Sequence, residues 1–343
     1  MTEVQIRELV QAAAQAVKDP ARTRVMYAGD RSKVRFELFH SKMSLCSQKV
    51  CALLAHKRIP YISHELTIIC YRDSSGHLTP AENYFAAYVT LRLLGRDSPN
   101  LKLAESWTGS TSVATEGFDA CVVPTLVDLQ AERVIVDSAR IIEYLDQVET
   151  TSPRLIPSDA ESAQKVRRQV EIVDRTPHGS LLAGFHPDDD RRPEVLRQIM
   201  LNYHLDKIPV LERLLADNSA DAQLTAAYKA KITKENVGEI VCHDDNAQRE
   251  ARRVVQRILR HLEEDLTSAQ SSWLCGPRVT AADLVWGVSL FRMKYLGLEY
   301  LWSALPRVSG YFGKLCDLAA IRSEAIQATV SSFPPSLYIT ETV

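Results

Sequence analysis

The fold is decided by the stretch VRFELFHSKMSLCSQKVCALLAHKRIPYISHELTI, residues 34–68. Residues 34–40 favour a strand, because they are rich in aromatic and β-favouring side chains. From about residue 47, Val50, Leu53 and Leu54 fall on one helical face. Pro60 ends that helix, and residues 61–68 alternate in polarity like a second strand. The stretch therefore predicts a βαβ unit with two parallel strands.

The same alternation continues to residue 150, with one long interruption. VVPTLVD (122–128) and ERVIVD (132–137) predict two strands joined by a turn, and DSARIIEYLDQV (137–148) predicts a helix. Residues 70–118 form an insertion whose middle, PAENYFAAYVTLRLLG (80–95), is helical in pattern. These elements predict a small α/β domain over residues 35–150.

The pattern changes to helices alone from about residue 151. Apolar residues between 251 and 266 recur at helical spacing, and Thr280 with Asp283 forms a capping-box pattern. We expect a helical extension over residues 1–34, an all-helical domain over 151–330 and a tail over 331–343.

Composition sets limits on the class of protein. The 343 residues carry a formal net charge of −2, which argues against a general nucleic-acid or anionic-membrane binder. No run approaches the length of a membrane span, and the first residues lack the apolar core of a secretory signal. Seven scattered cysteines without metal-ligand spacing fit a reducing cytoplasm and predict no metal site.

Cys46 stands where the first helix of the βαβ unit begins. The partial positive charge of a helix N-terminus stabilises a thiolate. Lys49 adds positive charge and is expected to contribute to glutathione binding. Ser44, two residues earlier, can donate its hydroxyl to a second sulfur. The alternative, a buried cysteine that packs as a small apolar group, is equally compatible with the residue alone.

Two further features lie at the same predicted edge of the sheet. Val123–Pro124 opens a strand, where a cis peptide would expose a backbone edge to an extended peptide-like ligand; an ordinary trans proline is the alternative. Asp137–Ser138 begins a helix and suits the amino and carboxylate groups of an amino acid, unless it is a plain N-cap. An amino-acid end, a peptide backbone and a sulfur together describe glutathione.

The motifs FELFHSKMSLCSQKV, VVPTLVD, VDSARIIEYLD and VTAADLVWGVSLF resemble the glutathione S-transferase superfamily in order and spacing. The Ser-x-Cys-Ser-x-Lys loop, with ENY, TGSTSVATEGFD and VDRTPHGSLL, is most similar to bacterial reductive dehalogenases of 2,5-dichlorohydroquinone and tetrachlorohydroquinone. The resemblance implies a thioredoxin-like glutathione-binding domain followed by an all-α domain that forms the wall of the substrate site.

The resemblance also implies roles for single residues. Val123 beside cis-Pro124 would pair with the cysteinyl backbone of glutathione, and Asp137 with Ser138 would hold its γ-glutamyl end. Ser44 would assist the glutathione thiolate. Cys46 would attack the glutathionyl-aromatic conjugate and form a mixed disulfide that a second glutathione resolves.

Weaker candidates concern the aromatic substrate. His178 follows Pro177 at an interruption between helices and could bind a phenol oxygen, although a kink with a solvated histidine is the more common arrangement. Trp286 could line an aromatic pocket, but its helical spacing favours core packing.

The sequence thus predicts glutathione-dependent dehalogenation of a chlorinated hydroquinone by a cytoplasmic enzyme. Cleavage of the β-aryl ether in lignin-type dimers is the alternative enzyme activity, and a non-catalytic partner subunit or binding module is the alternative of another class. A dimer, of identical or different chains, is expected, with no nucleic-acid or membrane partner.

Overall fold

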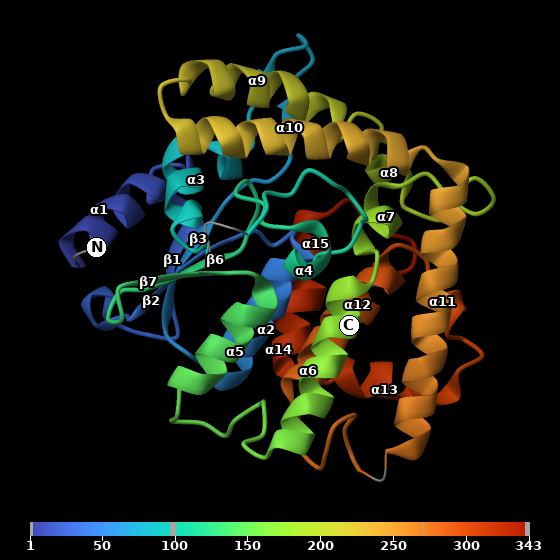
Figure 1. Ribbon diagram of the computed structural model, residues 1–343. Coiled ribbons are helices and arrows are strands. Elements are labelled where there is room, and N and C mark those ends of the chain that lie inside the picture. Colours follow the sequence, from blue (N-terminus) through green and yellow to red (C-terminus); the bar gives the residue numbers. More distant parts are fainter. Residues whose placement is uncertain (1–2, 97–100, 270, 340–343) are drawn as a thin grey trace.

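The computed structural model describes residues 3–96, 101–269 and 271–339 of the chain (Figure 1). Its centre is a five-stranded sheet in the order β1-β3-β2-β6-β7, in which β2 and β3 are parallel and the other three pairs are antiparallel. The strands are β1 (Thr23–Met26), β2 (Phe36–His40), β3 (Tyr61–Glu65), β6 (Thr125–Asp128) and β7 (Arg133–Val136). The predicted βαβ unit and the two later strands are confirmed.

The extension before residue 35 departs from the prediction. It begins with α1 (Glu3–Ala14), but Thr23–Met26 forms β1, so the prediction of a helical extension is wrong for this part. The strand β1 pairs with β3, and Arg24 contacts Glu65 at 3.2 Å. Without β1, the strand β3 would be an open edge with unpaired backbone groups, and pairing satisfies them.

Helices cover both faces of the sheet because side chains alternate along each strand. Phe36 and Leu38 of β2 face the core that contains α2 (Leu45–Lys57) and α5 (Ser138–Val148). Phe39 points to the opposite face, where it packs with apolar residues of α1 and of α3 (Ala86–Leu93).

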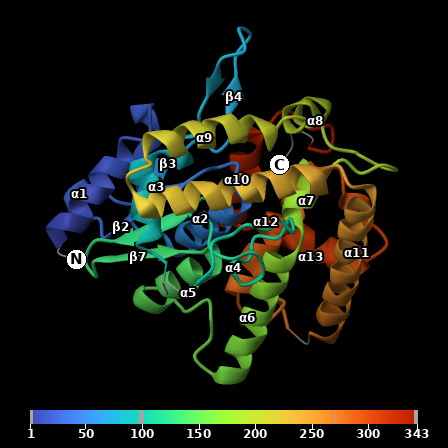
Figure 2. The same cartoon turned by 45° about the horizontal axis from the view of Figure 1, so that its top comes forward.

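The insertion over residues 70–118 forms several short elements. Its hairpin of β4 (Tyr71–Arg72) and β5 (Leu78–Thr79) projects from the body of the protein (Figure 2). Its helix α3 packs against α10 (Ala222–Cys242). In the turn just before α3, Tyr84 O accepts a hydrogen bond from Tyr228 Oη of α10 at 2.7 Å. The short helix α4 (Val113–Glu116) ends the insertion.

The second half of the chain is helical, as predicted. Its helices are α6 (Ala160–Arg175), α7 (His178–Ala183), α8 (Glu194–Met200), α9 (Ile208–Asp217), α10 (Ala222–Cys242), α11 (Asp245–Ser268), α12 (Ala281–Tyr295), α13 (Pro306–Cys316), α14 (Ala319–Ile321) and α15 (Ala328–Ser332), with a π-helical turn over Arg322–Gln327. The capping box of Thr280 and Asp283 opens α12, as expected. This helix is buried along most of its length and packs against α2 and α6, so it joins the two domains.

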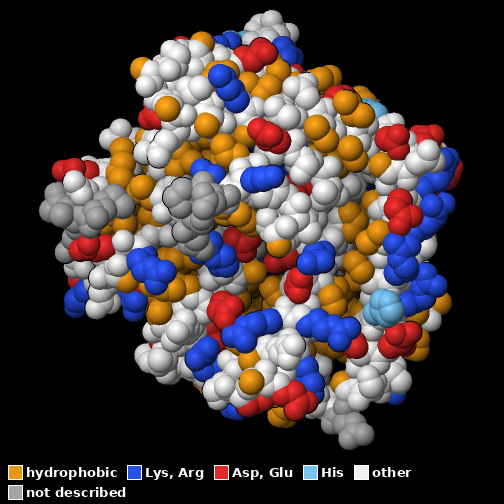
Figure 3. All heavy atoms as spheres, in the orientation of Figure 1, with side chains coloured by type: hydrophobic (Ala, Val, Ile, Leu, Met, Phe, Trp, Pro, Cys, Tyr) orange, Lys and Arg blue, Asp and Glu red, His pale blue; other side chains and the backbone are white. Residues whose placement is uncertain are grey.

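Charges of both signs are interspersed on the face shown in Figure 3. Several arginines of α11 have acidic partners: Arg249 contacts Asp188, and Arg253 and Arg257 contact Glu250. Such pairing is typical of a solvated helix face. Among the described helices, none is both long enough and apolar enough to cross a membrane.

Candidate active site

A cavity of about 250 Å³ lies where the α/β domain, the insertion and the helical domain meet. Seven of the residues singled out from the sequence line it: Ser44, Cys46, Val123, Pro124, Asp137, Ser138 and His178. They come from four separate stretches of the chain. The tertiary structure therefore brings the predicted sulfur site, peptide edge and amino-acid site to one place.

The start of α2 forms the sulfur end of this cavity. Ser44 is the N-cap, and its Oγ accepts a hydrogen bond from Ser47 N at 3.2 Å. Because the hydroxyl oxygen is the acceptor, its proton stays available for a sulfur in the cavity. Cys46 is the second residue of the 13-residue helix, is half-buried and has a free thiol. Cys46 lines the cavity and is less buried than Cys51 of the same helix, as the prediction of a sulfur site requires.

The loop before β6 forms the peptide-like edge. The Val123–Pro124 bond is cis, as the resemblance implied. The insertion helix α3 supports this loop: Tyr88 Oη donates to Val122 O at 2.6 Å, and Arg92 donates to the Pro124 carbonyl. Arg92 also donates to Asp119 O at 2.8 Å, so the insertion is an integral part of the site.

The start of α5 forms the third side. Asp137 has φ 75° and ψ 124°, a backbone conformation that costs a non-glycine residue about 1–3 kcal/mol. Its Oδ1 accepts hydrogen bonds from Ala139 N at 2.9 Å and Arg140 N at 3.3 Å. One carboxylate oxygen thus caps the helix, and the strained backbone holds Asp137 and the buried Ser138 at the wall of the cavity.

Lys49 is not among the residues that line this cavity. Its side chain is buried, and its Nζ donates to Asp174 on α6 and to Thr111 Oγ1 in the insertion, the latter at 3.4 Å. Burial alone would lower the pKa of Lys49, but the Asp174 carboxylate raises it above the usual value. The contacts of Lys49 therefore connect α2 to the helical domain and to the insertion.

The two candidates for substrate binding differ. His178 lines the cavity, is buried, and has its Nε2 at 2.8 Å from Ser289 Oγ. Burial lowers the pKa of His178 to about 3, so its ring is neutral rather than solvated and charged. Trp286 lies in the core, where its Nε1 donates to Gln169 Oε1 at 3.0 Å, and does not line the cavity. The prediction of Trp286 as a pocket residue is therefore corrected to the core alternative.

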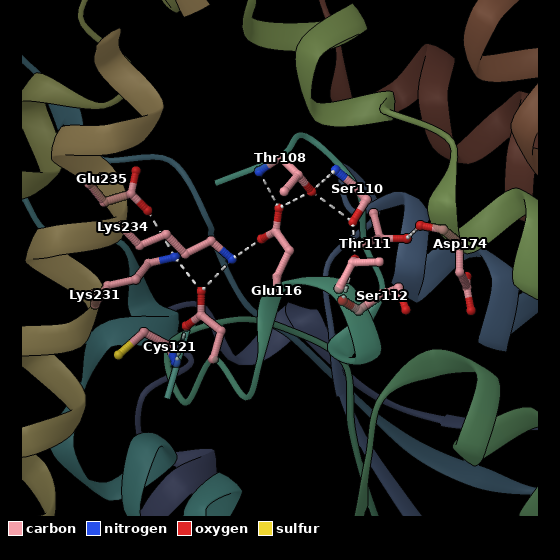
Figure 4. A network of polar contacts seen from close by, with 12 residues as sticks. Thr108, Ser110, Thr111, Ser112, Glu116, Cys121, Asp174, Lys231, Lys234 and Glu235 are labelled. Carbon is pink, nitrogen blue, oxygen red and sulfur yellow. Dashed lines mark hydrogen bonds and ion pairs between the residues drawn. The ribbon is translucent and has the colours of Figure 1, made fainter. Parts of the chain in front are cut away.

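The wall opposite the start of α2 is a network of buried charges that the sequence analysis missed (Figure 4). Lys231 and Lys234 of α10 contact Asp119 Oδ2 at 2.8 and 3.3 Å, and Lys234 also contacts Glu116 at 2.5 Å. Glu235 contacts Lys231, and it contacts Lys207 at 2.8 Å. Their spacing on α10 is visible in the sequence, but the same spacing is typical of an exposed helix face.

The network holds its carboxylates ionised. Burial would raise the pKa of Glu235, but Lys207 and Lys231 lower it well below the usual value. Asp119 behaves in the same way, because Lys231 and Lys234 outweigh its burial and lower its pKa. These contacts tie α10 to the end of the insertion and close the far side of the cavity.

Arg292 of α12 is a second residue that the sequence analysis missed. It is buried, lines the cavity, and donates from Nη2 to Met43 O at 3.0 Å and to Gln48 Oε1 at 3.1 Å. The signal for it was a charged residue inside the apolar run LVWGVSLFRM.

The chemistry available at this cavity comes from side chains and backbone. The described residues contain no group of three His, Cys, Asp or Glu side chains placed to hold a metal ion. A thiol and a hydroxyl at a helix N-terminus, a free strand edge and a capped helix start can bind a peptide-like thiol and bring its sulfur near Cys46.

Comparison with known proteins assigns this arrangement to a family. The family model of the glutathione S-transferase N-terminal domain matches residues 43–148, and that of the C-terminal domain matches residues 245–314. The chain belongs to the glutathione S-transferase family. Its α/β and all-helical domains are the two domains of that fold, so the predicted fold class is confirmed.

Among relatives, 2,5-dichlorohydroquinone reductive dechlorinase of Sphingobium indicum is 38% identical over 296 residues, which are 85% of this chain and 83% of the relative. Ganglioside-induced differentiation-associated protein 1-like 1 of the mouse is 27% identical over 224 residues, 58% of each chain. Among solved structures, the beta-etherase LigF of Sphingobium sp. has a TM-score of 0.54 at 14% identity, and the match covers 86% of this chain and 100% of LigF. That likeness concerns the fold.

Proposed function

We propose that the protein is a glutathione-dependent reductive dehalogenase of a chlorinated hydroquinone of the 2,5-dichlorohydroquinone type. The observation that carries the proposal is the half-buried Cys46, which lines the same cavity as Ser44, cis-Pro124 and Asp137. The identity of 38% over most of the chain to a 2,5-dichlorohydroquinone reductive dechlorinase supports the choice of substrate class.

The first step joins glutathione to the ring. The tripeptide backbone pairs at Val123 beside Pro124, its γ-glutamyl end is held by Asp137 and Ser138, and the Ser44 hydroxyl donates to its thiolate. The thiolate attacks the chlorine-bearing carbon, so that a C–S bond forms, the C–Cl bond breaks and chloride leaves with the bonding pair.

The second step removes glutathione from the ring. The Cys46 thiolate attacks the sulfur of the conjugate, so an S–S bond forms and the S–C bond breaks. The electron pair passes to the ring carbon, which takes up a proton and is thereby reduced. A second glutathione thiolate then attacks the mixed disulfide, releases oxidised glutathione and restores Cys46. Two glutathiones are oxidised for each chloride removed.

The Cys46→Ser variant tests this sequence of steps. It should release chloride, stop after the first step and accumulate the glutathionyl-hydroquinone conjugate, measured by mass spectrometry. The matched control is Cys316→Ser, which changes another half-buried cysteine that does not line the cavity and should leave turnover unchanged. Dechlorinated product at the normal yield from Cys46→Ser would show that Cys46 is not the attacking group.

A substrate panel separates the alternative aryl-ether activity. In that reaction Ser44 activates glutathione and Cys46 is not needed. Phenol release from an aryl-ether dimer, without chloride release from 2,5-dichlorohydroquinone, would replace the proposed function. We further propose that the enzyme acts in the cytoplasm. We also propose that it is a dimer, which sedimentation of the full chain would test.

A further inference from the structure

Arg292 differs from the lysines at the cavity, and also from the buried Arg92, whose Nε and Nη1 donate to Asp119 O, Pro124 O and Thr125 Oγ1. The Arg292 side chain is 2% exposed, comes from the last turn of the central helix α12, and shares the cavity wall with Met43, Ser44 and Cys46. It therefore brings a positive charge from the helical domain to the end of the cavity where the sulfur chemistry takes place.

The lysines of the cavity wall all have carboxylate partners. Lys207, Lys231 and Lys234 contact acidic residues of the α10 network, and Lys49, behind the wall, contacts Asp174. Arg292 has no carboxylate partner in residues 3–96, 101–269 and 271–339. Its charge is therefore not compensated by the parts of the chain that the structure describes.

The donors of Arg292 are also incompletely used. Its Nη2 donates to Met43 O and Gln48 Oε1, and its guanidinium carbon lies 4.5 Å from the centre of the Phe333 ring. Its Nε is buried and finds no hydrogen-bond partner among the described residues. Burying an uncompensated charge is unfavourable, and an anionic oxygen in the cavity would compensate it.

Burial lowers the pKa of Arg292 to about 10, so the guanidinium remains charged near neutral pH. The contacts to Met43 and Gln48 fix its position relative to the loop that carries Ser44 and Cys46. Apolar side chains line the same cavity, among them Met43 and Leu182, and they provide the kind of surface that an aromatic ring packs against. A phenol meets both requirements, because it presents a flat apolar ring and one oxygen that ionises readily.

We propose that Arg292 is a specificity-determining residue that binds the ionised hydroxyl oxygen of a phenolic substrate. This inference rests on the proposed function, since it assigns the hydroquinone oxygen to Arg292 while glutathione occupies the wall formed by Val123 and Asp137. The residue selects phenols over aromatic compounds whose oxygens are blocked.

The test compares the binding of 2,5-dichlorohydroquinone with that of its dimethyl ether by calorimetry. The full-length protein is first saturated with S-methylglutathione, which cannot react. The wild type should bind the hydroquinone roughly 10- to 100-fold more tightly than the ether, the range that a charge-assisted hydrogen bond provides. This preference should grow as the pH rises through the ionisation of the phenol.

The Arg292→Gln variant should bind the two compounds equally, with the affinities for the ether and for S-methylglutathione unchanged. Arg292→Lys should keep part of the preference, because it keeps the charge. The matched control is Lys294→Gln, a cation of the same helix that pairs with Glu299 and does not line the cavity; it should keep the full preference.

The inference is overturned if the wild type binds the hydroquinone and its dimethyl ether equally, a result that does not depend on any variant. It is also overturned if the Arg292→Gln variant keeps the preference for the hydroquinone, or if it loses affinity for both compounds alike. Chloride release is measured separately. A wild type that shows the Arg292-dependent preference but releases no chloride refutes the proposed function and leaves Arg292 as a phenolate-binding residue. Chloride release together with a preference that survives in Arg292→Gln refutes the inference alone.

Discussion

Two walls of the same cavity carry buried cations, but the cations of one wall have carboxylate partners and the cation of the other has none among the described residues. On the α10 wall, Lys231 and Lys234 face Asp119 and Glu235 in a closed network of ion pairs. On the α12 wall, Arg292 contacts a carbonyl, an amide oxygen and an aromatic ring, and no carboxylate among the described residues. The buried charges of the α10 wall therefore bind one another, whereas the charge of Arg292 on the α12 wall is available to a ligand.

The difference has a physical cause. Paired charges in a low dielectric attract each other strongly, so removing one partner leaves the other uncompensated. A single buried cation has no such partner to lose, but it lowers stability until an anion binds. The comparison predicts that variants on the α10 wall change stability, whereas variants on the α12 wall change ligand recognition.

The largest effect is expected when the α10 network is broken. Glu235→Gln leaves Lys207 and Lys231 with a neutral neighbour, and the free energy of unfolding should fall by about 3–5 kcal/mol in urea titrations. Lys165→Gln, which breaks an exposed pair with Glu161, is the control and should leave the free energy of unfolding almost unchanged, because exposed ion pairs contribute little. Equal losses in the two variants would contradict a structural role for the network.

A second effect concerns Lys49, a paired cation behind the Cys46 end. Lys49→Met alone should cost about 3 kcal/mol, because Asp174 then stays buried without its partner. The double variant Lys49→Met with Asp174→Leu should recover most of that loss and keep the wild-type affinity for glutathione in calorimetry. A double variant that is stable but no longer binds glutathione would instead assign Lys49 to the glutathione site.

Lowering the pH should reduce stability through the buried His178 beside the α12 wall. The pKa of His178 is about 3 in the folded protein because of burial, against about 6.5 in the unfolded chain. Its share of stability is therefore complete above pH 6.5 and is lost as the pH falls toward 3, with a slope of up to about 1.4 kcal/mol per pH unit.

Unfolding titrations at a series of pH values below 6.5 measure this slope. His178→Gln should reduce it by the share of one histidine. The control is His261→Gln, which changes a histidine whose side chain is exposed on α11. An unchanged slope in His178→Gln would mean that the folded protein takes up a proton at His178 in the same pH range as the unfolded chain.

The smallest change in stability is expected at Arg292 itself. Arg292→Met removes an uncompensated charge along with two hydrogen bonds, so the opposing effects should leave the free energy of unfolding within about 1 kcal/mol of the wild type. A loss as large as that of Glu235→Gln would erase the distinction between the two walls. Thermal unfolding of both variants in the same buffer makes the comparison.

Much of the fold could be predicted from periodicity, because each pattern reports a local choice. The alternation in residues 61–68 and the helical spacing of Val50, Leu53 and Leu54 led to β3 and α2 as observed. The strand β1 could not be found in this way, since TRVM is short and shows no alternation. It is a strand because β3 offers it an unpaired edge, which is a contact between distant parts of the chain.

The sequence by itself determined the two-domain plan, the place of Cys46 at a helix start and the three motifs that describe a glutathione site. Only the tertiary structure decided which charges are compensated. Lys49, Lys231 and Arg292 look alike as residue types, but burial and the partner that each meets across domains separate them. The electrostatic energy of a buried charge depends on its neighbours in space, and those neighbours lie more than 100 residues away for Lys49 and Lys231.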